Sequence, residues 1–135
     1  MRFVDTNVLV YAASTDARDQ HKSSFARTLL KQRDLALSVQ VLQEFYVQVT
    51  RATRSHRLSH DDAVSLMLTW QRFRVQDLTL GIVMNATTAA ARWQISYWDA
   101  AILESARAAG CDTVLSEDLQ HGQNFGGVQV LNPFR

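Results

Sequence analysis

Four acidic residues, far apart along the chain, are the side chains best suited to carry chemistry. They are Asp5, Glu44, Asp99 and Asp118. Carboxylates that are brought together repel one another and cannot all ionise without a cation. Oxygen ligands suit a hard cation such as Mg²⁺ or Mn²⁺, which can bridge phosphate oxygens and lower the pKa of a bound water. The sequence therefore predicts metal-assisted cleavage of phosphodiester bonds without a protein nucleophile.

Other common chemistries lack the residues they need. The only cysteine, Cys111, excludes an internal disulfide and a cysteine metal cage. The four histidines do not have the spacing of metal ligands. No Gly-rich phosphate loop and no Gly-x-Ser-x-Gly nucleophile motif is present. The acids remain the strongest candidates.

Each acid also has a purely structural interpretation. Asp5 and Asp99 could cap helices that begin beside them. Asp118 could be a turn residue, and its neighbour Glu117 is a rival ligand. Glu44 lies at the edge of an apolar helical stripe, where burial without a partner would be costly, although a solvated helix edge is the alternative. The joint pattern favours a site over these separate interpretations.

The elements that must position the acids are short apolar runs alternating with longer helical stretches. Strands are expected at Phe3–Val4, Leu35–Val39, Val75–Leu78, Thr113–Leu115 and Val128–Leu131. Helices are expected at Thr6–Ala13, His21–Gln32, Val41–Ala52, a segment capped by Ser59 and ending at Trp70, a segment capped by Thr79 and ending at Trp93, and Asp99–Ala109. This alternation predicts one α/β domain over residues 1–135. Its architecture should be a three-layer α/β/α sandwich with a mainly parallel sheet of about five short strands.

This topology also predicts where the acids lie. In an open parallel sheet, ligands bind beyond the carboxyl ends of the strands. Asp5 and Asp118 each follow a predicted strand, and Glu44 lies near the start of a helix that follows another. Asp99 joins them if its helix points its N-terminus toward the same edge. We expect one acidic pocket there.

The composition is that of an ordinary globular domain. The 135 residues are 47% hydrophobic, and the net charge of +1 does not by itself indicate a nucleic-acid binder. No segment resembles a signal peptide, and the apolar runs are shorter than the roughly 20 residues that a membrane span needs. Together with the single thiol, these features favour a cytoplasmic protein with no membrane association.

Four short motifs surround the acids. They are Val4-Asp5-Thr6-Asn7-Val8-Leu9, Gln43-Glu44-Phe45, Trp98-Asp99-Ala100-Ala101-Ile102 and Leu115-Ser116-Glu117-Asp118-Leu119. In this order, and in a chain of this length, they resemble PIN-domain ribonucleases. They are most similar to the VapC toxins of bacterial toxin–antitoxin pairs, and the resemblance covers the whole chain.

The resemblance implies a PIN-like fold and a ribonuclease function. By position, the four acids match those that hold Mg²⁺ or Mn²⁺ and activate water to cleave RNA. Asn7 and Ser116 match polar neighbours that orient ligands or water, and the family spacing favours Asp118 over Glu117. Members of the family usually form homodimers, and a cognate antitoxin protein masks their toxicity.

Two further groups of residues have open interpretations. Arg51, Arg54 and Arg57 could steer RNA phosphates, or they could form a solvated helix end. The aromatic residues are expected mainly as core or dimer contacts, with base stacking as the alternative. They are Trp70, Trp93, Tyr97 and Trp98.

Two other functions compete with a nuclease. A phosphotransfer domain would also place an Asp after the first strand. However, the phosphatase pattern needs a second Asp where Asn7 stands, and the receiver pattern needs a late Lys that neither Lys22 nor Lys31 supplies. A non-catalytic PIN-like protein-binding module would be expected to lose two or more acids, and all four are present. Metal binding would separate this module from an enzyme.

Overall fold

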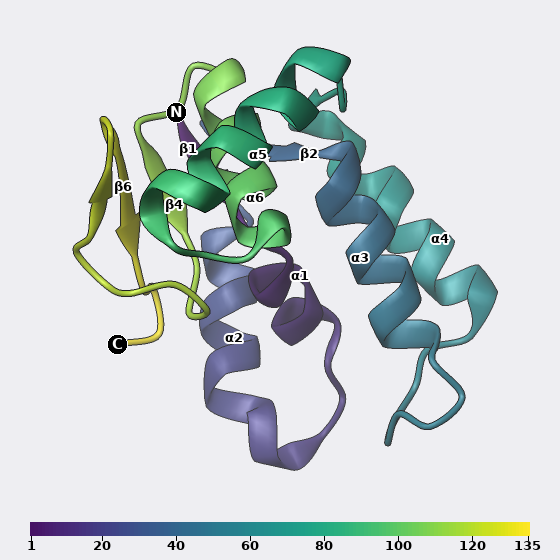
Figure 1. The fold of residues 1–135 in the computed structure, drawn as a ribbon. Coiled ribbons are helices and arrows are strands. Elements are labelled where there is room, and N and C mark those ends of the chain that lie inside the picture. Colours follow the sequence, from purple (N-terminus) through teal and green to yellow (C-terminus); the bar gives the residue numbers. More distant parts are fainter.

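Strands and helices alternate through most of the chain, and the computed structural model describes residues 1–135 (Figure 1). The strands are β1 (Arg2–Val4), β2 (Leu35–Ser38), β3 (Arg74–Gln76), β4 (Thr113–Leu115), β5 (Asn124–Phe125) and β6 (Val128–Leu131). The α-helices are α1 (Thr6–Ala13), α2 (Gln20–Leu29), α3 (Val39–Thr50), α4 (His60–Thr69), α5 (Leu80–Trp93) and α6 (Tyr97–Ala108). Two 3₁₀ turns are η1 (Ala17–Asp19) and η2 (Trp70–Arg72). None of these helices combines the length and hydrophobicity needed to cross a bilayer.

All strands join one sheet in the order β3-β2-β1-β4-β6-β5. The first five strands in this order pair in parallel, which confirms the predicted α/β class. From β1 the chain builds outward through β2 and β3, and it then returns to place β4 on the other side of β1. The direction of strand order therefore reverses between β1 and β4.

The prediction of five strands missed β5. This two-residue strand pairs antiparallel with β6, with Phe125 opposite Val128. It is too short to have a hydrophobic period, but the turn between the strands has a sequence signal. Gly126 and Gly127 have φ values of 62° and 101°, a conformation that favours glycine and is typical of tight hairpins.

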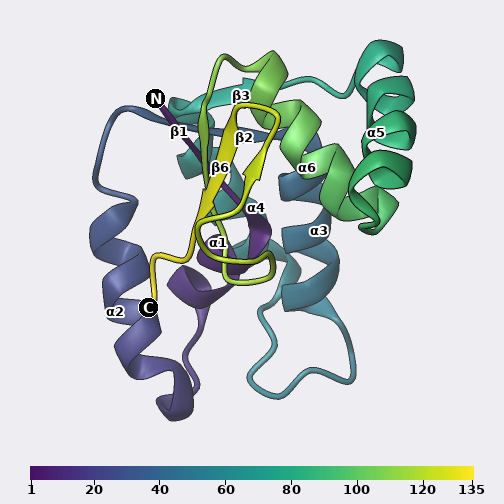
Figure 2. The ribbon, with the colours of Figure 1, turned by 60° about the vertical axis from the view of Figure 1, so that its left-hand side comes forward.

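Helices cover both faces of the sheet, as the predicted three-layer sandwich requires. Figure 2 shows α2 on one side of the sheet and α5 with α6 on the other. α6 contacts β2, β4 and β6, and α5 packs mainly on α6. In the opposite layer, α1 packs against α2 and α3, and α3 packs against α4.

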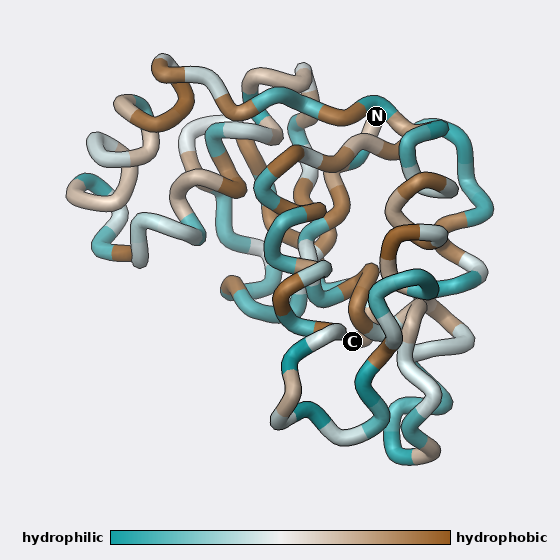
Figure 3. Tube along the Cα trace, turned by 90° about the vertical axis from the view of Figure 1, so that its right-hand side faces the viewer, coloured by the Kyte–Doolittle hydropathy of each residue, from teal (hydrophilic) through white to brown (hydrophobic).

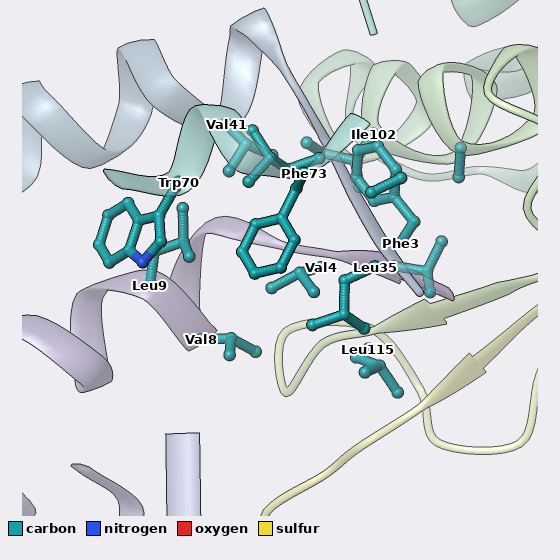
Figure 4. Close-up of a cluster of buried hydrophobic side chains, with 14 of the residues drawn as sticks. Phe3, Val4, Val8, Leu9, Leu35, Val41, Trp70, Phe73, Ile102 and Leu115 are labelled. Atoms are coloured by element: carbon teal, nitrogen blue, oxygen red, sulfur yellow. The ribbon is translucent and has the colours of Figure 1, made fainter. Parts of the chain in front are cut away.

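The core consists of fully buried strand residues and the helix faces that cover them. Phe3, Val4 and Leu35 are at most 1% exposed, and hydrophobic segments lie in the interior of the chain trace (Figure 3). Figure 4 shows these side chains gathered with residues from α1, α3, α6 and η2. The ring of Phe45 packs edge-on to the ring of Trp70, with the ring centroids 4.8 Å apart. The apolar residues of β1, β2 and β4 are therefore covered on both faces, as predicted, whereas β3 and β6 each have an exposed residue.

Ser and Thr side chains define the starts of four helices. Ser38, Ser59, Thr79 and Ser96 each accept a hydrogen bond from a backbone N–H three residues later. Ser59 and Thr79 are the caps that the sequence predicts. The predicted start of the last helix at Asp99 is wrong, because Ser96 caps it and the helix begins at Tyr97.

Arg107 attaches the β5–β6 hairpin to α6. Its guanidinium donates to the carbonyl oxygens of Gly126 and Phe125, both at 2.7 Å. We expect Arg107→Ala to lower the free energy of unfolding by about 1–2 kcal/mol, because hydrogen bonds from a charged donor are among the stronger ones. Urea denaturation measures this loss. Arg33→Ala, at an exposed position, is the matched control and should change stability little.

Candidate active site

The reversal of strand order places the carboxyl ends of β1 and β4 side by side. Asp5 follows β1, and Ser116, Glu117 and Asp118 follow β4. The backbone N–H of Asp5 donates to the carbonyl of Leu115 at 3.0 Å, which extends the pairing beyond β1. In open α/β sheets this position forms the crevice in which ligands bind.

Asp5 is a buried carboxylate, with only 4% of the residue exposed. Its Oδ2 accepts a hydrogen bond from Ser116 Oγ, and its Oδ1 accepts one from the Thr6 backbone N–H, both at 2.7 Å. Through Thr6, Asp5 also caps α1, so the capping interpretation is correct but incomplete. Burial, with smaller contributions from the charges of Asp118 and Glu44, raises the pKa of Asp5 from 3.8 to about 7.

Ser116 and Asn7 connect Asp5 to Asp118. The Asn7 amide donates to Ser116 Oγ at 3.1 Å and to Asp118 Oδ2 at 3.2 Å. The backbone N–H of Asp118 donates to the same Ser116 hydroxyl at 3.1 Å. A single buried hydroxyl therefore contacts Asp5, Asn7 and the backbone of Asp118, and it fixes the distance between the two acidic residues.

Glu44 reaches the cluster from α3. Its Oε1 accepts hydrogen bonds from Thr6 Oγ1 at 3.1 Å and from Gln40 Nε2 at 3.4 Å. The residue is half-buried, so it lies at a partly solvated edge of the helix and is held there by these two hydrogen bonds. Burial raises the pKa of Glu44, and the charges of Asp99 and Asp118 add to the effect.

Asp99 lies in the first turn of α6 and is half-buried. Because Ser96 is the N-cap, Asp99 is not the capping residue, although its carboxylate hydrogen-bonds to the Ser96 side chain at the start of the helix. Burial is the main cause of its raised pKa, and the charge of Asp118 contributes. Asp99 at the N-terminus of α6 is therefore near enough to Asp118 for the charge of one to affect the other.

The four acids converge electrostatically. The charges of Asp118 and Glu44 contribute to the raised pKa of Asp5, and the charge of Asp118 contributes to the raised pKa values of Glu44 and Asp99. The oxygen-only donor set fits Mg²⁺ or Mn²⁺ by its chemistry. No three acidic, histidine or cysteine side chains are already arranged to hold an ion, so binding by three carboxylates would require their side chains to move together.

Glu117, the rival of Asp118, is committed to other partners. Its carboxylate accepts from Tyr11 Oη at 2.6 Å and from Lys22 Nζ at 2.9 Å. The Lys22 ammonium also lies over the rings of Tyr11 and Phe134. This arrangement directs Glu117 away from the other acids, which favours Asp118 as the ligand on this loop.

Two residues that support Glu44 were not predicted from the sequence. Thr6 lies between Asp5 and Asn7, and its hydroxyl bonds to Glu44 from the first turn of α1. Gln40 lies four residues before Glu44 on α3, a spacing that places both side chains on one helix face. That spacing could have identified Gln40, whereas the contact of Thr6 depends on how α1 packs on α3.

The three predicted phosphate-binding arginines line different hollows. Arg51 lies in a groove with Glu44, whereas Arg54 lines a small cavity near Asp16 and His56. Arg57 lines a third hollow, beside Tyr46 and His60. Among the predicted phosphate-binding arginines, only Arg51 lies in a cavity that also contains one of the four acids.

Ser116→Ala tests whether the shared hydroxyl holds the cluster together. The substitution leaves buried Asp5 with one partner instead of two, so we expect a loss of about 1–3 kcal/mol in the free energy of unfolding. We also expect the pKa of Asp5 to rise further, because the lost hydrogen bond lowers it. Urea denaturation and carboxyl NMR titration measure these effects. Ser24→Ala, on the exposed side of α2, is the control and should change neither.

Comparison with known proteins shows which family the chain belongs to. The sequence model of the PIN domain matches residues 2–123. A search of curated proteins gives no match.

Solved structures with the same fold are distant in sequence. VapC20 of Mycobacterium tuberculosis, described as a toxin that cleaves the sarcin–ricin loop, is 22% identical with a TM-score of 0.68, over 87% of this chain and 92% of that chain. A toxin–antitoxin complex from Klebsiella pneumoniae contains a chain with 16% identity and a TM-score of 0.70, over 98% of both chains. FitAcB from Neisseria gonorrhoeae matches with 21% identity and a TM-score of 0.63, over 99% of both chains. At these identities the likeness shows a shared fold.

Proposed function

Since this chain belongs to the PIN-domain family, we propose that it is a metal-dependent endoribonuclease that hydrolyses RNA phosphodiester bonds. The observation that carries the proposal is the placement of Asp5. Its buried carboxylate, with a pKa of about 7, lies at the reversal of strand order and senses two of the other three acids. Such a cluster is costly in the free protein and becomes favourable when a divalent cation occupies the crevice, where it can then bind a phosphate.

The proposed cofactor is Mg²⁺ or Mn²⁺, held by Asp5, Glu44, Asp99 and Asp118. When bound, it would supply Lewis-acid activation of the phosphate and of the attacking water. The chain itself supplies orientation through three side chains. Ser116 and Asn7 hold Asp5 and Asp118, and Thr6 holds Glu44.

The proposed partners follow from the relatives. Several matched structures are toxin–antitoxin complexes, which supports a role as the toxin of such a pair, masked by a cognate antitoxin protein. A homodimer is also proposed, with the exposed apolar side chains of Leu80 and Met84 on α5 as candidate contacts. RNA as substrate and antitoxin as partner imply a cytoplasmic protein.

Incubation of the purified chain with total cellular RNA tests the proposed activity. We expect discrete new RNA ends with Mg²⁺ or Mn²⁺, and none with EDTA. Asp99→Asn should lose the activity, whereas Asp77→Asn, at an exposed position outside the cluster, should retain it. An intact RNA population together with no calorimetric binding of either cation would instead support a non-catalytic protein-binding module.

A further inference from the structure

A groove of about 360 Å³ adjoins the acid cluster, between α3 and the start of α6. It is lined by Gln40, Gln43, Glu44, Val47, Gln48, Arg51 and Trp98. The residues from α3 recur every three or four positions, so they form one face of that helix. The opposite face, with Phe45 and Val49, is buried in the core. α3 therefore presents a face rich in glutamine to this groove, and Glu44 belongs both to the groove and to the acid cluster.

Trp98 is the aromatic side chain of this groove, and it is unusually exposed. Its exposed fraction is 65%, whereas Trp70 is 4% exposed and packs on Phe45. Trp93 is half-buried against Phe125. Trp98 directly precedes Asp99 in the first turn of α6, and its ring packs edge-on against Tyr97 with the ring centroids 5.1 Å apart. An exposed indole offers a flat surface on which a nucleobase can stack.

Gln40 gives the groove a hydrogen-bond acceptor that has no partner in the protein. The residue is 5% exposed, and its Nε2 donates to the Trp98 carbonyl at 3.2 Å and to Glu44. Both partners are acceptors, so the orientation of the amide is fixed. Its Oε1 is buried and has no donor within the protein. This buried oxygen in the wall of the groove is therefore an unsatisfied acceptor in the free protein, and an N–H donor that reached it would be stabilising.

We propose that the groove binds one unpaired nucleotide of the RNA substrate, next to the bond that is cut. The base stacks on Trp98 and presents an N–H edge to the glutamine face of α3, and the guanidinium of Arg51 lies near a phosphate. This inference rests on the proposed nuclease function and adds the position of the substrate. A base in a duplex cannot enter the groove without leaving its stack, so cleavage should occur beside single-stranded nucleotides.

The groove fits a nucleotide better than a protein segment. Five of its seven lining residues are polar, and Val47 and Trp98 supply apolar surface on which a base can lie. The groove also opens beside Glu44. One RNA strand can therefore place a nucleotide in the groove and the adjoining phosphate at the acid cluster, which a protein segment cannot do.

Binding of mononucleotides tests the groove without any cleavage. The four nucleoside 5′-monophosphates are titrated in EDTA, with calorimetry for affinity and tryptophan fluorescence for location. We expect saturable quenching in the unmodified protein. Trp98→Ala should weaken the best binder about 10-fold or more, and Gln48→Ala should weaken it to a smaller extent. Leu68→Ala truncates a residue that is 61% exposed on α4 and should bind normally.

Cleavage mapping distinguishes failure of the groove from failure of the function. We expect Trp98→Ala to raise KM and to change the sequences at the new RNA ends. Suppose that the unmodified protein cuts RNA, and that Trp98→Ala and Gln48→Ala have the same KM, the same RNA ends and the same nucleotide affinity as the unmodified protein. The groove assignment is then wrong, and the proposed nuclease function is retained. If the chain cuts no RNA but binds nucleotides through Trp98, the nuclease proposal fails and the groove is retained as a nucleotide site. If Trp98→Ala converts a dimer to monomers without changing nucleotide affinity, the groove is a subunit contact and the proposal is overturned.

Discussion

Replacement of Asp5 by asparagine should abolish RNA cleavage while stabilising the metal-free protein at alkaline pH. Asparagine keeps the size of the side chain and the acceptor for the Thr6 N–H, but it removes the charge. Substitution of residues that merely support a metal ligand costs about 10–100-fold. Loss of a ligand charge should therefore lower kcat/KM by at least about 100-fold, measured as the initial rate on a short single-stranded RNA.

The stabilising half of this prediction follows from the pKa of Asp5. A carboxyl group whose pKa rises from 3.8 in the unfolded chain to about 7 in the fold lowers the free energy of unfolding by up to about 4 kcal/mol at high pH. The asparagine amide bonds less well to Ser116, which offsets part of the gain. We expect a net gain of about 1–3 kcal/mol at pH 8 in EDTA, measured by urea denaturation.

Asp34→Asn, at an exposed position, provides the comparison, because it removes the same charge without relieving a buried carboxylate. It should cut RNA normally and change stability little. An Asp5→Asn protein that cleaves at the normal rate would remove Asp5 from the catalytic set. A loss of stability at pH 8 would mean that its carboxylate is not destabilised by burial.

The free energy of unfolding of the metal-free protein should fall as pH rises from about 4 to about 7.5. The folded state binds a proton at Asp5 more tightly than the unfolded state does, because burial raises the pKa of Asp5 to about 7. Stability therefore decreases with pH wherever the folded state carries more protons. The pKa values of Glu44 and Asp99 are raised for the same main reason, so both add to the slope.

Saturating Mg²⁺ or Mn²⁺ should flatten this slope and raise stability most at pH 8. Binding only to the folded state contributes about 2.7 kcal/mol at a cation concentration 100 times Kd. Thermal or urea denaturation at several pH values, with EDTA or with the cation, measures both effects. The Asp5→Asn protein should show a shallower slope in EDTA. An equal gain from the cation at pH 5 and pH 8 would contradict the proposed ligand set.

The sequence was sufficient to predict most of the fold and the segments that carry the acids. Apolar runs ending at Val4 and Leu115 correctly predicted strands, since strands that are apolar throughout are buried on both faces. The position of Asp5 and Asp118 at one sheet edge followed from the parallel topology. The first helix, Thr6–Ala13, was predicted with the bounds that the structure has.

The features of the site that could not be predicted from the sequence depend mainly on contacts between segments that are far apart in the chain. The bond from Thr6 to Glu44 requires α1 to lie against α3, and the bond from Gln40 to the Trp98 carbonyl requires α3 to meet α6. The start of α6 was misplaced because Ser96 and Asp99 are both good caps, and local propensity does not choose between them. The partners of Glu117 are likewise supplied by Tyr11 and Lys22, about a hundred residues earlier.

The central position of β4, between β1 and β6, has a consequence for biosynthesis. β1 leaves the ribosome well before β4, so its neighbour on one side is made only when residues 113–115 are translated. Until then Asp5 has neither Ser116 nor Asp118 beside it. A nascent chain that lacks the segment after β4 therefore cannot assemble the cluster, and the proposed attack on RNA must wait until that segment has been translated.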